Sequence, residues 1–214
     1  MEKVNTDLIG KVVNLASRSA KFVATVGLSE VYPDDGGLFA EAARIGDEIK
    51  SAYEKCDFNR AMRLVMSLAD QANPYVENNK PWELRKDPTQ SQKLQDVCTV
   101  SLNLFRQLVI YLAPVLPRLA QQTVELLAKP IQHWDESKTP LTGTPVAKFK
   151  HMLRRVEEKD IQAMIEESKE IDSAPTCSPE IEDRWKDSGD SMAAEPLADE
   201  CSIDDFVKVD LRVA

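Results

Sequence analysis

Apolar residues recur every three or four positions along most of this chain, the spacing that places them on one face of an α-helix. In the first segment the recurring positions form a single stripe, made of Leu8, Val12, Leu15, Ser19, Phe22 and Val26. The same periodicity predicts helices over 2–26, 38–55, 58–72, 91–113 and 116–128, the fourth being the most apolar. The pattern therefore predicts an all-α fold, a bundle of helices.

Turn-forming and helix-breaking residues separate these helices. Residues 32–37 contain one Pro, two Asp and two Gly, which is typical of a turn. Asp57 stands where its side chain can cap the third helix. Pro74 is expected to kink or end that helix, because proline has no N–H to donate and its ring clashes with the preceding turn. Residues 77–90 are predicted to form a polar connection that carries Trp82.

The last third of the chain changes in character. A short helix is predicted near 147–154 and a solvent-facing helix over 159–172. Residues 173–200 combine Pro, Ser and acidic residues, the composition of a flexible linker. The end of the chain alternates like a β-strand, and a lone strand cannot satisfy its own hydrogen bonds. We therefore expect a helical domain over 1–172, an acidic linker over 173–200, and the truncated start of another domain over 201–214.

Composition indicates a cytoplasmic globular protein. Hydrophobic residues make up 43% of the 214 positions, and no apolar run approaches the roughly 20 residues that span a bilayer. The N-terminal residues are polar and contain no apolar signal core, which argues against secretion. The four cysteines are far apart, and with only two histidines beside them they predict reduced thiols and no zinc site.

The net charge of −9 is unevenly distributed. Residues 1–155 contain 21 Lys and Arg against 18 Asp and Glu, a net charge of +3, whereas residues 156–214 contain 6 against 18, a net charge of −12. Non-specific duplex binders are usually far more basic than +3. This charge is nevertheless compatible with a protein that recognises a few specific bases.

The sequence contains no pattern typical of an active site. The seven glycines form no phosphate-binding loop, and the two distant histidines support no nucleophile–base arrangement. No carboxylate stands in an apolar context that would mark a tuned acid. These observations argue against a complete small enzyme.

Three side chains are candidates for binding an unpaired nucleobase. Asn14 and Arg18 are four residues apart on the flank of the first apolar stripe, so they project from one helix face. Trp82 follows a proline in the polar connection and offers a flat ring for stacking. Simpler explanations exist for each: a solvated surface amide for Asn14, a surface charge for Arg18, and an aromatic residue packed between elements for Trp82.

Five short segments occur in the order found in bacterial methionyl-tRNA synthetases: residues 11–18, 69–76, 81–82, 103–106 and 114–117. Residues 2–172 thus resemble the α-helical anticodon-binding domain of this class I family. Residues 203–214 resemble the opening of the tRNA-binding OB-fold domain appended to many of its members.

The resemblance implies roles for particular residues. In that family the residues matching Asn14 and Arg18 contact anticodon bases, and the one matching Trp82 stacks on the first of them. Asn73 and Tyr75 are candidates for the border of the same pocket, although a tyrosine near a helix end is usually packed. Arg155 is a candidate for a contact with the RNA backbone. Its alternative role is that of a surface salt-bridge partner of the neighbouring glutamates.

The resemblance also implies partners and limits. The expected partners are the anticodon stem-loop of tRNA(Met) and the catalytic domain of the same enzyme; a homodimer would form only through a complete OB-fold domain, and neither DNA nor a membrane is expected. The intact enzyme uses ATP and Mg²⁺ and carries zinc in an insertion, all outside this chain, so the fragment is expected to be inactive in isolation. The alternative function is a helical protein–protein adaptor, which predicts that Asn14, Arg18 and Trp82 lie apart and that the exposed patch is apolar.

Overall fold

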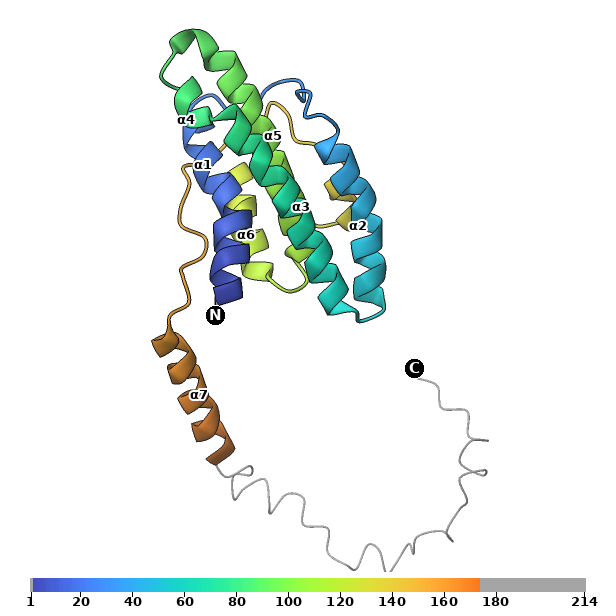
Figure 1. The fold of residues 1–214 in the computed structure, drawn as a ribbon, viewed down its shortest axis with the longest axis vertical. Coiled ribbons are helices and arrows are strands. Elements are labelled where there is room, and N and C mark those ends of the chain that lie inside the picture. Colours follow the sequence, from blue (N-terminus) through green and yellow to red (C-terminus); the bar gives the residue numbers. More distant parts are fainter. Residues whose placement is uncertain (1, 174–214) are drawn as a thin grey trace, which may run out of the picture. The chain divides into compact units, whose positions relative to one another are not determined.

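The computed structural model describes residues 2–173, and its regular elements are helices (Figure 1). In chain order they are η1 (Val4–Val13), α1 (Asn14–Val23), α2 (Leu38–Glu54), α3 (Phe58–Asn79), α4 (Pro81–Leu84), η2 (Pro88–Gln90), α5 (Ser91–Leu112), α6 (Pro117–Leu127), η3 (Trp134–Lys138) and α7 (Glu158–Ser173). The all-α prediction is confirmed, since the described residues contain no strand. The predicted linker from residue 174 and the strand-like end over 201–214 lie outside the described residues. Contacts divide the chain into two units, Met1–Ile161 and Gln162–Ala214, and the bundle belongs to the first.

Helix α5 forms the centre of the bundle, with α1, α2, α3 and α6 packed against it (Figure 1). Every residue from Val97 to Leu112 is buried, so this helix has no solvent face over more than four turns. Burial on all sides matches its rank as the most apolar segment of the sequence. Its polar side chains must find partners inside the protein, because an unpaired buried polar group is costly.

Two of those buried polar side chains fix the long connection between α6 and α7. The amide of Asn103 donates to the carbonyl of Leu141 (2.9 Å) and accepts from the N–H of the same residue (2.6 Å). Arg106 donates to the carbonyl of Pro130 (3.3 Å) and forms an ion pair with Glu136. Both residues belong to the segment 103–106 that supports the family resemblance, and here they position a loop.

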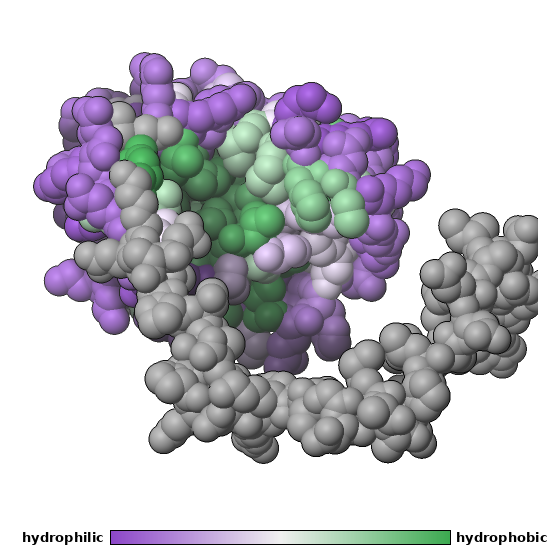
Figure 2. All heavy atoms as spheres, turned by 90° about the horizontal axis from the view of Figure 1, so that it is seen from below, coloured by the Kyte–Doolittle hydropathy of each residue, from purple (hydrophilic) through white to green (hydrophobic). Residues whose placement is uncertain are grey.

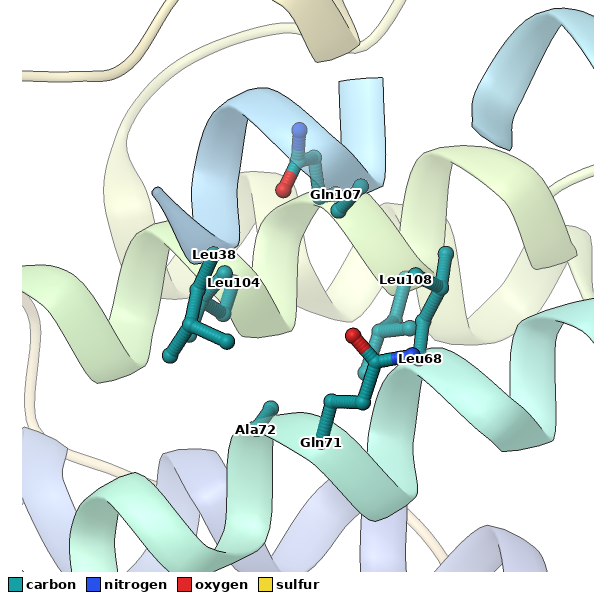
Figure 3. Close-up of a pocket in the computed structure, with 8 residues that line it drawn as sticks. Leu38, Leu68, Gln71, Ala72, Leu104, Gln107 and Leu108 are labelled. Carbon is teal, nitrogen blue, oxygen red and sulfur yellow. The ribbon is translucent and has the colours of Figure 1, made fainter. Parts of the chain in front are cut away.

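A small gap in the core lies between α2, α3 and α5 (Figure 3). Leu38, Leu68 and Leu104 line it, and Gln71 extends along its edge. Its volume is about 10 Å³, the space of roughly one water molecule. The gap is therefore a packing defect and not a ligand site.

Two predicted helix ends were wrong, those of the first and third helices. The first helix ends at Val23 instead of residue 26, because Gly27 adopts a positive φ of 76° there and its N–H bonds to the carbonyl of Val23 (2.7 Å). Val26 consequently lies outside the helix and is 61% exposed. Pro74 does not end α3, which continues to Asn79. Buried apolar residues on both sides of the proline, Ala72 and Val76, hold the two halves of α3 on the core.

One predicted segment was also wrong. Residues 147–154 have no regular secondary structure instead of forming a helix. Two contacts tie this stretch to other elements: the N–H of Ala147 donates to the carbonyl of Leu126, and Val156, just beyond it, exchanges hydrogen bonds with the side chain of Asn5. Residues 77–90 are largely helical, since α3, α4 and η2 occupy most of them. None of the helices within the described residues is both long and apolar enough to cross a membrane.

The cap of α3 offers a test of the fold. The carboxylate of Asp57 accepts from the N–H of Arg60 (3.0 Å), as the sequence predicted. Asp57→Ala should lower the free energy of unfolding by about 1 kcal/mol, because one helix-terminal N–H loses its acceptor. Urea unfolding followed by circular dichroism measures this change. Asp57→Asn is the matched control, since asparagine retains the acceptor; equal losses in the two variants would contradict the capping role.

Candidate nucleic-acid interface

Asn14 and Arg18 lie on one face of the first helix. The wider π-helical winding of η1 changes to ordinary α-helical winding at Asn14, so Arg18 follows it by about one turn. Both side chains are half-buried, and the buried residues Leu15 and Ser19 beside them face the core. The hydroxyl of Ser19 forms a 2.8 Å hydrogen bond with Ser101 of α5, which fixes the rotation of α1.

Trp82 is positioned by a sharp turn between α3 and α4. Lys80 adopts a left-handed conformation with φ 44°, which is uncommon for a residue other than glycine. Its carbonyl accepts from the N–H groups of Glu83 (2.8 Å) and Leu84 (3.2 Å), so the chain begins a new helical turn at once. Pro81 is buried as the first residue of this turn, and Trp82 is partly buried against the core.

The guanidinium of Arg18 lies over the indole of Trp82, 4.6 Å from the ring centroid. The same guanidinium forms an ion pair with Glu77, two residues before the end of α3. The side chain of Arg18 is 31% exposed, so this contact is at the surface and in reach of a ligand. Arg18 and Trp82 thus meet although 64 residues separate them, and Asn14 stands one turn away on α1. The adaptor alternative predicted that they lie apart.

A second contact of the same kind joins α1 and α4. Arg85, the residue that follows α4, lies over the ring of Phe22, 5.7 Å from its centroid, and Lys21 lies 4.9 Å from the same centroid. The contact between Phe22 and Arg85 was not predicted from the sequence, and neither was the ion pair of Glu77 with Arg18. Phe22 was assigned only to the apolar stripe; its spacing of four residues from Arg18 was the one signal that linked it to the site.

Asn73 and Tyr75 are directed to different sides of α3, because residues two apart are about 200° apart around a helix. The amide of Asn73 donates to the carbonyls of Lys11 (3.3 Å) and Ala69 (2.7 Å), and thus joins α3 to the first helix about one turn before Asn14. The side chain of Tyr75 does not take part in this contact between α3 and the first helix. Burial raises the pKa of Tyr75 to about 12, with a smaller contribution from the carboxylates of Asp35 and Asp96.

Arg155 is exposed in the extended segment that precedes α7. The next residue, Val156, exchanges two hydrogen bonds with the side chain of Asn5 (2.9 and 2.8 Å), near the start of η1. Arg155 is therefore far from Arg18, on the order of 20 Å along the first helix at 1.5 Å per residue. Among the described side chains, no carboxylate pairs with Arg155; the nearby Glu157 pairs with Lys159 (2.6 Å).

Exposed apolar residues gather at the opposite end of the bundle from α4, which Figure 2 shows from below. Val4 begins η1, Phe58 begins α3 and Val115 connects α5 to α6; their exposed fractions are 41%, 53% and 43%. Two further exposed apolar residues, Val26 and Val31, lie in the connection that follows α1, with exposed fractions of 61% and 78%. On η1, Lys11 pairs with Asp70 (2.8 Å) and Asp7 (3.2 Å), and these hydrogen bonds raise the pKa of Lys11. These three residues line the same surface groove as Val4.

Known proteins resemble this chain in sequence and in fold. The family model described as the anticodon-binding domain of tRNA ligase matches residues 35–177, a range that includes Glu77 and Trp82 but starts after Arg18. The chain is 56% identical to the methionine–tRNA ligase of Rhodopirellula baltica, over all of this chain and 31% of that protein. It is 51% identical to methionine–tRNA ligase 1 of Sorangium cellulosum, over all of this chain and 33% of that protein.

A solved structure shows the same fold. The free form of the Mycobacterium tuberculosis methionyl-tRNA synthetase matches with a TM-score of 0.63 and 24% sequence identity, over 72% of this chain and 34% of that one. In both comparisons the chain spans only about a third of the length of the protein it matches.

A double-mutant cycle tests the stacked pair. The Arg18→Ala and Trp82→Ala substitutions should show a coupling of about 0.5–1 kcal/mol in the free energy of unfolding, the range of partly exposed cation–π contacts. Urea unfolding of the wild type, the two single variants and the double variant gives this value. The control cycle pairs Trp82→Ala with Arg44→Ala, because Arg44 lies on α2 and pairs with Glu41. A coupling as small as that of the control cycle would contradict the contact.

Proposed function

This chain belongs to the family of anticodon-binding domains of tRNA ligases, and from this premise we propose that it recognises the CAU anticodon of tRNA(Met). The single observation that carries the proposal is the contact between Arg18 and Trp82, with the ion pair to Glu77 behind it. An exposed guanidinium and an indole side by side are suited to a nucleobase that has left its stack.

Trp82 supplies the stacking that an anticodon base loses when it turns out of the loop. Base–aromatic stacking contributes about 1–3 kcal/mol per base. In the free protein the guanidinium of Arg18 covers the indole. The incoming base therefore takes the place of the guanidinium on the ring, and Arg18 turns toward the edge of the base while Glu77 keeps it close.

Specificity comes from the polar groups around the stacked base. Arg18 donates from a rigid fork, and Asn14 offers both a donor and an acceptor to the Watson–Crick edge of the base. A wrong base would leave some of these groups unpaired beneath the bound RNA, which costs more than the lost hydrogen bond alone. The amide of Asn73 is already bonded to Lys11 and Ala69, so it supports the border of the site.

The remaining chemistry belongs to other parts of a ligase-length protein. Activation of methionine with ATP and Mg²⁺ and attachment to the tRNA are assigned to those parts, in the cytoplasm. Within the described residues, no group of three or more His, Cys, Asp or Glu side chains is placed to hold a metal ion, so no step of this proposal passes through one. The exposed apolar end near Val4, Phe58 and Val115 is a suitable surface for another domain of the same protein.

Replacement of Trp82 tests the stacking. Trp82→Ala should weaken binding of an anticodon stem-loop bearing CAU by roughly 5- to 150-fold, the equivalent of about 1–3 kcal/mol. Fluorescence anisotropy of a labelled stem-loop measures the dissociation constant. Trp134→Phe is the control, because Trp134 packs against Tyr53 and Tyr111 elsewhere in the bundle. Unchanged affinity in a folded Trp82→Ala protein would refute the stacking role.

Replacement of Arg18 tests base reading. Arg18→Ala should reduce the preference for CAU over stem-loops with altered anticodons by roughly tenfold, since one good contact to a base edge is worth about 1–3 kcal/mol. The same anisotropy titration with CAU and altered stem-loops gives this ratio. Arg44→Ala serves as the matched control on α2, where it should leave the ratio unchanged. A preference that survives the loss of Arg18 would count against its role as a base reader.

A further inference from the structure

The two contacts between α1 and α4 are reciprocal. Arg18 and Phe22 are four residues apart on α1, and Trp82 and Arg85 are three residues apart on the turn that begins with α4, so each pair shares a face. The cation of α1 lies on the aromatic ring of α4, and the cation of α4 lies on the aromatic ring of α1. The ring of Phe22 therefore stands one helical turn beyond the Arg18–Trp82 contact.

The charges at these two rings differ in their partners. Arg18 is paired with Glu77, and Lys86 at the end of the α4 turn is paired with Glu83 (2.9 Å). Lys21 and Arg85 are both exposed, and among the described side chains no carboxylate lies within ion-pair distance of either. Both charged groups lie within 6 Å of the Phe22 centroid, which places them less than about 11 Å apart. Two positive charges thus share one ring without an anion between them.

We propose that Lys21 and Arg85, held against Phe22, bind the phosphate backbone of the RNA next to the base stacked on Trp82. This inference rests on the proposed function and adds a second contact to it. Arginine and lysine are the usual partners of phosphate oxygens, and arginine can bind two of them at once. The ring of Phe22 is half-buried against the core and covered by both cations, so it supports them and is not itself a platform for a second base.

The two contacts would divide the work of recognition. Phosphate contacts fix the position and direction of a nucleic acid but carry no direct sequence information, whereas contacts to base edges specify it. Lys21 and Arg85 would therefore set the affinity for any anticodon stem-loop and align its backbone on α1 and α4. The ring of Trp82 with Arg18 and Asn14 would then select the base.

The salt dependence of binding tests this proposal. The double variant Lys21→Gln/Arg85→Gln should lower the slope of log K against log salt by about 1.4–1.8, since each lost phosphate contact accounts for roughly 0.7–0.9. Affinity should fall by a similar factor for CAU and altered stem-loops, so the preference for CAU is kept. The control is Lys50→Gln/Lys55→Gln, which removes the same charge from exposed positions at the end of α2.

The outcomes are distinguishable. A slope equal to that of the control variant, or a loss of the CAU preference in the double variant, would overturn the backbone contact while the proposed function stands. Wild-type protein that binds all stem-loops equally, with a slope that still falls in the double variant, would refute anticodon reading and support the backbone contact. Wild-type protein that binds no stem-loop would refute both.

Discussion

Burial of α5 from Val97 to Leu112 is the constraint on which the other elements depend. Most of the polar side chains on this buried stretch find partners inside the protein, and each partner fixes another part of the chain. Ser101 binds Ser19 of α1, Asn103 binds the backbone of Leu141, and Gln107 donates to the carbonyls of Phe39 and Ser137. The position of the surface site depends on this core, because the hydrogen bond between Ser19 and Ser101 fixes the rotation of the helix that carries Arg18.

The site combines weak individual forces. An exposed ion pair and a surface cation–π contact are each worth about 1 kcal/mol or less, and neither would hold a flexible loop in place alone. Here the backbone has already been ordered by the burial of Val76 near the end of α3, the left-handed turn at Lys80 and the buried Pro81. The ion pair and the cation–π contact therefore only need to fix the orientations of the Arg18, Glu77 and Trp82 side chains. Residues 1–155 have a net charge of only +3. This charge suits a site in which the positions of a few side chains, and not the electrostatic field of the whole domain, would select a ligand.

The sequence was sufficient for local features and insufficient for contacts between distant elements. Periodicity located α2, α5 and α6 within a residue or two, because their apolar faces repeat at helical spacing. Periodicity did not predict the end of α3 or the irregular backbone of residues 147–154. In both places, packing or hydrogen bonds to other elements prevailed over local preference. Only the family resemblance connected Arg18 with Trp82. No local pattern could identify Glu77 or Arg85, since their importance comes from the side chains of α1 that the fold places opposite them.

The guanidinium that covers Trp82 has a consequence for the free protein. An uncovered indole at the surface would promote nonspecific association with other exposed apolar groups. With Arg18 over its face, the ring presents a hydrated charge to passing molecules. Under the proposed function, a ligand would need both a flat ring and a polar edge to displace the guanidinium, so the side chain proposed to recognise the base would also shield the indole from other apolar surfaces.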